Sequence, residues 1–442
     1  MPLLLEKTSN TPDAVRAPSS GIYLRAPRLK GLVTFLMVMG PGLIVMEDDT
    51  DAGAVSAYTQ AGAQYGTHLL WVLLLLLPIT YLTQEMVARL GIATGEGHAA
   101  MIYRRFGRWW GNFSLIDLQV TNFLTLVTEF AGISLAATKL GIPPIIAVPT
   151  TAVGLIFLVT SGGYLRWERI TIGLCLLDIT WFVMAAVVRP HWGDVAHNSF
   201  IPTRPVGGVT SGLVFLVIAI VGTTIAPWQL FFQQSCVADK KLRFSDLKWS
   251  RLDTAVGAVF TIIVAGAMML VGDAGFRHGI TFVDPGQLAV ALEAHYGPFV
   301  KTGMLLMMIN AAVLGTMAIS LSSAWAYGEV RGWPHSLHRG IKEAPGFYAV
   351  FVLCVGAAAG IVLIPNAPLY LIILGVQVLA GVMLPSAIVF LQLLLNDREL
   401  LGEEFVNRPW NNWANWTVVA VLFALSLVLA AQVALPSLFP AS

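Results

Sequence analysis

The chain has 442 residues, of which 56% are hydrophobic and only 12% are charged. A soluble domain carries about 25% charged residues, so this composition excludes a disordered protein and argues against a soluble enzyme. Lys and Arg number 26 against 25 Asp and Glu, and this near-neutral balance gives no sign of a nucleic-acid partner. The composition therefore predicts an all-α protein with many membrane spans.

Apolar stretches of about 20 residues, the length that crosses a bilayer core, recur along the chain. The first and the sixth contain polar or helix-breaking residues, and we count each as one interrupted span. This predicts eleven spans, at about residues 31–66, 68–92, 113–138, 143–162, 170–188, 210–238, 252–273, 298–328, 346–364, 368–395 and 413–436. Residues 1–30 carry no apolar run, and they predict a disordered cytoplasmic tail without a cleaved signal peptide.

Positive charge sets the orientation of a membrane protein, because cytoplasmic loops hold an excess of Lys and Arg. With the N-terminus in the cytoplasm, the cytoplasmic segments hold all but five of the Lys and Arg residues. The outer segments then hold only Lys139, Arg189, Arg204, Arg277 and Lys301. We therefore expect a plasma-membrane protein with a cytoplasmic N-terminus and an extracytoplasmic C-terminus. The long outer loops near 189–208 and 274–297 are expected to hold short amphipathic helices.

The first span is interrupted by acidic residues. Four carboxylates stand within five positions, at Glu47, Asp48, Asp49 and Asp51. An ionised side chain at mid-membrane depth costs about 2.5–3.5 kcal/mol, so these groups cannot face lipid. A solvated loop between two short apolar segments is the alternative interpretation, but neither half is long enough to cross a membrane alone. We expect a helix that is broken inside the protein.

The sixth span has a second break, at Pro227. Proline removes a backbone donor and clashes with the preceding turn, which frees carbonyls near Thr223. The two breaks stand five spans apart, as expected for inverted repeats, and such pairs are typical of transporters with a site at the midplane. The expected division is a tail (1–30), a first repeat (31–190), a second repeat (191–395), and a cytoplasmic loop with the eleventh span (396–442).

Carboxylates and freed carbonyls form an oxygen-rich site that suits a cation. An amino-acid substrate would need free N–H groups for its carboxylate, which disfavours a sodium-coupled amino-acid transporter. An intramembrane enzyme would need a nucleophile or a histidine cluster at membrane depth, and the sequence offers neither. The residues therefore predict a monomeric cation transporter in the lipid bilayer, not an enzyme and without a cofactor.

These residues resemble the NRAMP family of divalent-metal transporters. Residues 40–66 look like the family's first helix and the loop after it, and residues 90–95 match the end of its second helix. Residues 396–408 look like the loop after its tenth helix. The resemblance follows the same order over most of the chain. It implies a LeuT-like fold that works by alternating access.

The chain departs from the family at the metal site. The family's first-helix motif reads Asp-Pro-Gly-Asn, whereas residues 51–54 read Asp-Ala-Gly-Ala, so Ala54 replaces an amide ligand. The family's sixth-helix Met-Pro-His is Ala-Pro-Trp at 226–228, so the thioether and the first histidine are absent. A second family histidine is replaced by Gln233. Glu129 is retained, while the family's acid three residues earlier aligns with Leu126 and another with Gln119.

These departures look like the magnesium-transporting branch of the family. Thioether ligands help to select soft transition metals, whereas carboxylate, carbonyl and water suit Mg²⁺ and Mn²⁺. Two alanines also widen the site, and Mg²⁺ usually keeps several waters. No histidine falls at mid-membrane, which indicates transport driven by membrane potential without proton coupling. The alternative is a proton-coupled Mn²⁺/Fe²⁺ transporter of the same family.

The candidate metal-site residues come from the two breaks and the tenth span. Asp51 is expected to bind the ion directly or through one water, with helix capping as the alternative role. Thr223 would offer its carbonyl, and the other residues would line the site or hold the ion's water. The full candidate set is Asp51, Asp48, Thr223, Ala226, Ala54, Gln377, Gln229 and Gln233. For Glu129 and Asp178, a functional and a structural role remain equally open.

Overall fold

The computed structural model describes residues 38–48, 50–203, 208, 210–365 and 367–434, and every regular element in this part of the chain is helical. The elements are α2 (Pro41–Asp48), α3 (Ala52–Tyr65), α4 (Leu70–Thr94), α5 (His98–Lys139), α6 (Pro144–Ser161), α7 (Tyr164–Cys175), η1 (Leu176–Asp178), α8 (Ile179–Val187), α9 (Trp192–Phe200), α10 (Ser211–Thr224), α11 (Pro227–Asp239), η2 (Phe244–Asp246), α12 (Leu247–Arg277), α13 (Pro285–Tyr296), α14 (Pro298–Arg331), α15 (Pro345–Val362), α16 (Leu369–Leu394), α17 (Arg398–Phe405) and α18 (Pro409–Ala434).

The helices match the eleven predicted spans. Among the described residues, 10 stretches are long and apolar enough to cross a membrane. The pair α2 and α3 supplies the remaining crossing, because 8 and 14 helical residues are each too short to span but together reach about 33 Å. The predicted short helices in the outer loops are α9 and α13.

Several spans begin earlier than their apolar patterns predicted, and the third and fifth differ most. The third was expected from residue 113, but α5 starts at His98 and bends at Gly107, where a φ of 81° admits glycine without strain. The charged residues before the bend hid this segment from a search for apolar runs. The fifth span was expected from residue 170, but it starts with α7 at Tyr164.

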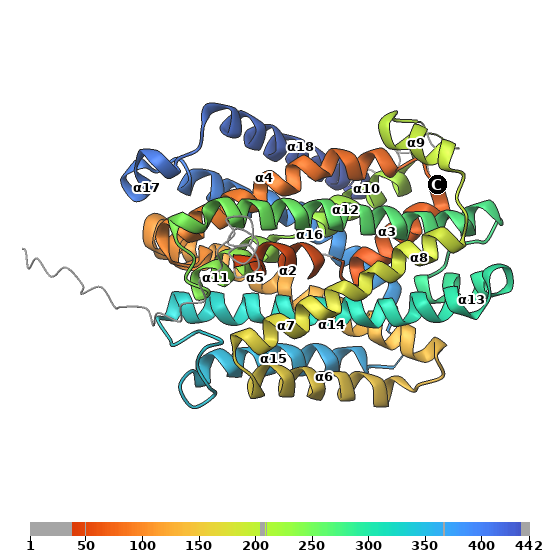
Figure 1. Cartoon of the computed structure of the whole chain (residues 1–442), viewed down its shortest axis with the longest axis horizontal. Coiled ribbons are helices and arrows are strands. Elements are labelled where there is room, and N and C mark those ends of the chain that lie inside the picture. The colour runs from red at the N-terminus through yellow and green to blue at the C-terminus, as the bar shows by residue number, and fades with distance from the viewer. Residues whose placement is uncertain (1–37, 49, 204–207, 209, 366, 435–442) are drawn as a thin grey trace, which may run out of the picture. The chain divides into compact units, whose positions relative to one another are not determined.

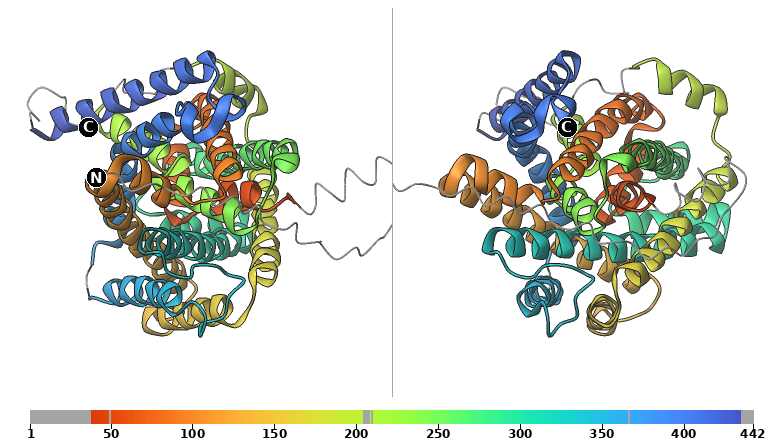
Figure 2. Two further views of the ribbon diagram at one scale, coloured as in Figure 1. Left: turned by 90° about the vertical axis from the view of Figure 1, so that its left-hand side faces the viewer. Right: turned by 60° about the vertical axis from the view of Figure 1, so that its left-hand side comes forward.

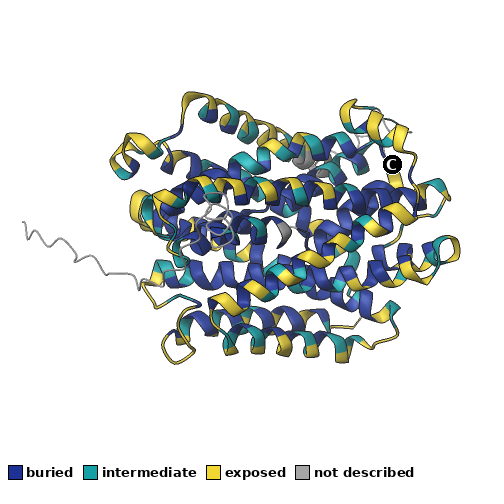
Figure 3. Cartoon of the chain, viewed as in Figure 1, coloured by how far each residue is buried: buried dark blue, intermediate teal, exposed yellow. Residues whose placement is uncertain are grey.

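The two broken helices lie in the interior of the bundle. In Figures 1 and 2, α2, α3, α10 and α11 are surrounded by longer helices, and they pack on α12, α4, α5, α14 and α16. Figure 3 shows these central elements mostly buried, whereas α6 and α15 carry exposed residues along one side. The apolar exposed faces belong to the outer helices, as expected for a protein surrounded by lipid.

Small residues let the broken helices approach their neighbours closely. A Cβ at Gly62 of α3 would overlap the Met269 carbonyl on α12. A Cβ at Gly222 of α10 would overlap the backbone of α16 at Gln377 and Gly381. Close backbone contact of this kind is a usual means of packing helices in membranes. These contacts hold α3 against α12 and α10 against α16.

Some predictions lie beyond what the structure describes. The expected tail at 1–30 falls outside the described residues, as do Asp49 and the side chain of Glu47. The division into repeats at 31–190 and 191–395 stays a prediction.

Candidate metal-binding site

The first break separates the buried ends of two helices, with Asp51 in an extended conformation between them. The helix α2 ends at Asp48 and α3 begins at Ala52, with Asp51 between them at φ −67° and ψ 179°. The Asp51 Oδ1 atom accepts the Ala54 N–H at 2.7 Å, so the capping role left open by the sequence is confirmed. A carboxylate has two oxygens with several lone pairs, so capping leaves capacity for an ion.

The second break faces the first. The helix α10 ends at Thr224 and α11 begins with Pro227, as the sequence predicted. In a continuous helix the N–H of residue 227 would bond to the carbonyl of Thr223, and proline has no N–H to give. The Thr223 hydroxyl lies 3.5 Å from Asp51 Oδ1, and the Tyr58 and Thr224 hydroxyls lie 2.8 Å apart. The two breaks are therefore joined by side-chain oxygens.

Glu129 belongs to this site, a role that the sequence left open. Its Oε2 atom accepts the Ala52 N–H at 3.0 Å, and the side chain is fully buried. Gly315 of α14 makes room for both acids, because a Cβ there would lie 2.9 Å from the Glu129 carboxyl and 3.0 Å from the Asp51 Cβ. The only sequence signal for a role of Glu129 in the site was its position as an intramembrane acid that the family also carries.

Three candidate residues line the break without a charged group. Ala54 and Ala226 are buried, so methyl groups stand where the family motifs carry an amide and a thioether. Gln377 of α16 is buried against the backbone of the first break, since a Cβ at Gly53 would overlap its amide. The Gln377 Nε2 atom has no hydrogen-bond partner among the described residues. Its amide is thus placed beside the start of α3 with hydrogen-bonding capacity left over.

Asp48 is fully buried, and neither of its oxygens has a hydrogen-bond partner in the described part of the chain. Asp51 and Asp178 lie close enough to interact with it electrostatically. Asp178 accepts hydrogen bonds from Thr50 Oγ1 at 3.2 Å and Asn310 Nδ2 at 3.3 Å. The structure therefore gathers Asp48 and Asp178 beside the Asp51 break.

The two glutamines of α11 are held by neighbouring helices. Gln229 accepts a hydrogen bond from Gln84 of α4 at 3.1 Å, and Gln233 donates to Thr254 of α12 at 3.2 Å. Their expected role in holding the ion's water stays a prediction. The Gln233 Oε1 atom is buried without a partner among the described groups.

Acidic side chains alone do not complete a metal site. Within the described ranges, no group of three His, Cys, Asp or Glu side chains is placed to hold an ion by itself. An ion at Asp51 would therefore take its other ligands from backbone carbonyls, neutral side chains and water. Such a mixed oxygen set is the one that hard divalent cations use.

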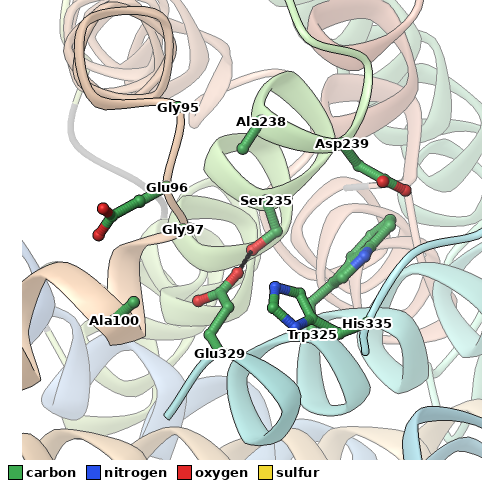
Figure 4. A pocket seen from close by; sticks show the side chains of 10 residues that line it. All are labelled: Gly95, Glu96, Gly97, Ala100, Ser235, Ala238, Asp239, Trp325, Glu329 and His335. Carbon is green, nitrogen blue, oxygen red and sulfur yellow. Dashed lines mark hydrogen bonds between the residues drawn. The ribbon is translucent and has the colours of Figure 1, made fainter. Parts of the chain in front are cut away.

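A separate pocket of about 310 Å³ lies at the other end of α11 (Figure 4). The Ser235 hydroxyl donates to Glu329 Oε1 at 2.6 Å, which joins α11 to α14. The Gln234 Oε1 atom accepts a hydrogen bond from His98 Nδ1 at 2.8 Å, and the Nε2 atom donates to the Glu96 carbonyl at 2.9 Å. These contacts join the end of α11 to α14, to the start of α5 and to the Glu96 backbone, away from the Asp51 break.

The chain is similar to known metal transporters. The family described as "Natural resistance-associated macrophage protein-like" matches residues 42–432. The divalent metal cation transporter MntH of Ralstonia nicotianae is 28% identical over 447 residues, which cover 96% of this chain and 97% of that protein. The divalent metal cation transporter MntH 1 of Pseudomonas aeruginosa is 28% identical over 453 residues, covering 96% and 98%.

Solved structures show the fold. The Eremococcus coleocola manganese transporter in complex with a bis-isothiourea compound matches with a TM-score of 0.72 and 19% identity, over 91% of this chain and 88% of that one. The structure of MhsT in complex with L-phenylalanine matches with a TM-score of 0.57 and 14% identity, over 89% and 98%. These likenesses confirm the predicted LeuT-like fold.

Proposed function

This chain belongs to the natural resistance-associated macrophage protein-like (Nramp) family and is a divalent metal cation transporter, and from that premise we propose that its main cargo is partly hydrated Mg²⁺, with Mn²⁺ also carried. It is a transporter and not an enzyme. The proposal places it in the magnesium-transporting branch of the family, as a monomer in the plasma membrane with its N-terminus in the cytoplasm and its C-terminus outside.

The composition of the two breaks carries the proposal. Asp51, Thr223 and Glu129 offer oxygen, and the buried positions 54 and 226 hold alanine. A site without thioether or imidazole has no soft ligand to select Mn²⁺ or Fe²⁺ over the more abundant Mg²⁺. Two methyl groups also leave space around Asp51 for the waters that Mg²⁺ gives up reluctantly.

Membrane potential is sufficient to drive the proposed transport. A divalent cation gains about 4.6 kcal/mol on crossing 100 mV, which corresponds to accumulation of more than a thousandfold. The eight histidines fall in loops or near helix ends, and the site holds none of those described. We therefore propose uptake without a coupled proton.

The second candidate function is proton-coupled transport of Mn²⁺ or Fe²⁺. The names of the relatives favour it, since one of the similar structures is a manganese transporter and the MntH proteins are named for divalent metal transport. In this case Glu129, which is fully buried beside Asp51, is the group that would carry the proton. The two candidates share a site and differ in cargo and coupling.

Purified protein in liposomes separates the two candidates. The vesicles hold a Mg²⁺-sensitive dye and, in a parallel sample, a pH dye, with a negative potential inside. We expect Mg²⁺ entry with a flat internal pH, and loss of entry in Asp51→Asn. The matched control is Asp194→Asn, because Asp194 is an exposed acid on α9, and this variant should transport normally. Mn²⁺ entry with internal acidification and no Mg²⁺ entry would establish the second candidate instead.

A further inference from the structure

A pocket of about 390 Å³, here called the arginine pocket, lies between α4, the start of α12 and the segment that joins α17 to α18. None of the residues that line it belongs to either helix break. In Figure 1, α17 lies at the end of the bundle opposite α9 and α13. The charged side chains that line the pocket are Glu85 and Arg89 of α4, Arg251 of α12, Glu404 of α17 and Arg408.

Two arginines of this pocket share one carboxylate. The Glu85 Oε1 atom accepts a hydrogen bond from Arg89 Nε at 3.2 Å and another from Arg251 Nε at 2.8 Å. Glu85 and Arg89 are buried, whereas Glu404 and Arg408 are exposed and add one charge of each sign. One carboxylate balances one guanidinium, so the wall of the pocket keeps an excess positive charge. Such a charge attracts an anion.

The walls of the arginine pocket are already held in place. Arg89 Nη2 donates to the Asn407 side chain at 2.7 Å and Nη1 donates to the Phe405 carbonyl, which fixes residues 405–408 against α4. Arg251 uses Nε and Nη2 toward Glu85, and its side chain is about half exposed. A guanidinium has five N–H groups, so Arg251 can hold an anion and Glu85 together. A wall formed in advance reduces the ordering cost of binding.

The pocket also lies beside residues typical of the lipid headgroup level. Trp410 lines it and is 55% exposed, and Trp413 and Trp416 of the same helix are exposed as well. Tryptophan side chains gather where a membrane meets water. Leu82 and Leu247 add apolar surface to the wall. The arginine pocket therefore offers positive charge and apolar contact side by side at this level.

The chain that leads into α12 carries more positive charge. Residues 240–251 hold five Lys and Arg residues and one acid, Asp246. Lys240 pairs with Glu168 at 2.6 Å, which leaves four of the five basic residues for other partners. Basic clusters next to a membrane span attract anionic lipids. This segment would concentrate such lipids at the pocket that Arg251 lines.

We propose that the arginine pocket binds the phosphate of an anionic phospholipid from the adjacent leaflet. Arg251 of α12 and Arg408 before α18 hold the phosphate oxygens, since guanidinium groups match phosphate in geometry as well as charge. Trp410 contacts the glycerol and the first part of the acyl chains. The bound lipid thus joins α12 to the start of α18. The site does not depend on which ion the transporter carries.

Native mass spectrometry of the delipidated protein in detergent tests the arginine pocket, with anionic phosphatidylglycerol and zwitterionic phosphatidylcholine as probes. The wild type should bind its first phosphatidylglycerol about fivefold more tightly than phosphatidylcholine. The double variant Arg251→Gln/Arg408→Gln should lose this preference, and Glu85 keeps Arg89 as its partner there. The control Arg104→Gln/Arg398→Gln removes the same charge from two exposed arginines outside the pocket and should keep the preference.

Glu404→Gln is a variant that should gain binding. It removes an exposed acid from the pocket wall, so phosphatidylglycerol should bind about threefold more tightly, a result that a misfolded protein would not give. Equal binding of both lipids by the wild type, or a preference that the double variant keeps, would overturn the proposal. An excess of inorganic phosphate should leave the lipid bound. Displacement by phosphate would indicate a site for soluble anions and overturn the assignment to a lipid.

Discussion

At the scale of single residues, the site is built by acids that cap a broken helix. Asp51 accepts the Ala54 N–H and Glu129 accepts the Ala52 N–H, so both carboxylates are oriented by the start of α3. Both carboxylates lie at the positive end of the α3 helix dipole. Orientation in advance means that an ion binds without first ordering these side chains. The same acids therefore stabilise the break and supply carboxylate oxygens that a cation can bind.

Gly315→Ala tests how tightly these acids are packed. The new methyl group would meet the Glu129 carboxyl at 2.9 Å and the Asp51 Cβ at 3.0 Å, so one of the acids must shift. We expect a loss of about 1–3 kcal/mol of stability and a sharp drop in Mg²⁺ uptake. Calorimetry and flux assays measure the two effects.

The control for this substitution is Gly356→Ala on α15, where a new Cβ meets no atom within 4 Å. It should leave uptake unchanged. If Gly315→Ala transports as well as Gly356→Ala, the acids are not packed as described.

At the scale of elements, α2 is held at its N-terminus by α12 and α11. Asp253 of α12 accepts the N–H groups of Gly42 at 2.7 Å and Leu43 at 3.2 Å, with Gly40 at 3.3 Å. Lys240, just after α11, donates to the Met39 carbonyl at 2.8 Å. These bonds fix the start of α2, which forms one side of the first break.

Asp253→Ala should release α2. The N–H groups that it leaves without an acceptor cost about 1–3 kcal/mol in the observed position of α2, which favours states with α2 displaced. In a background without native cysteines, we expect Leu43→Cys to react with a water-soluble thiol reagent about tenfold faster. Asp246→Ala serves as the control, because this half-buried acid just before α12 accepts the Arg243 N–H and no N–H of α2. Equal labelling rates in both variants would show that Asp253 does not hold α2.

Pro227→Ala tests the second break. An alanine restores an N–H that can bond to the Thr223 carbonyl, and the carbonyl would then be a poorer ligand. We expect Mg²⁺ affinity to fall about threefold to tenfold by calorimetry. The control is Pro149→Ala, because Pro149 lies within the continuous helix α6. Affinity that stays the same in both variants would remove the Thr223 carbonyl from the ligand set.

The sequence predicted the elements better than the contacts between them. Apolar length located the spans, and Pro227 with the acids at 47–51 located both breaks. The start of α5 was missed, because a charged segment before Gly107 has no apolar run. The partners of Glu129 and Asp178 could not be predicted, since they lie on helices distant in the sequence. Such long-range contacts depend on helix packing, which periodicity does not specify.

At the scale of the whole molecule, transport should follow the voltage as two charges. With a potassium diffusion potential, a tenfold larger potassium gradient should raise the Mg²⁺ accumulation ratio about a hundredfold at constant pH. Internal Mg²⁺ at steady state, measured over several gradients, gives this slope. A steeper slope that depends on the pH gradient would indicate a co-transported proton.

Restoring the missing amide and thioether tests the oxygen-only site most directly. The wild type should take up Mg²⁺ as readily as Mn²⁺ when both are present, because the site selects by oxygen alone. The double variant Ala54→Asn/Ala226→Met should shift uptake strongly toward Mn²⁺, with Mg²⁺ uptake falling at least tenfold. Competition between the two ions in the same liposomes measures the ratio. A wild type that takes up Mn²⁺ and ignores excess Mg²⁺ would show that the site does not favour Mg²⁺ as proposed.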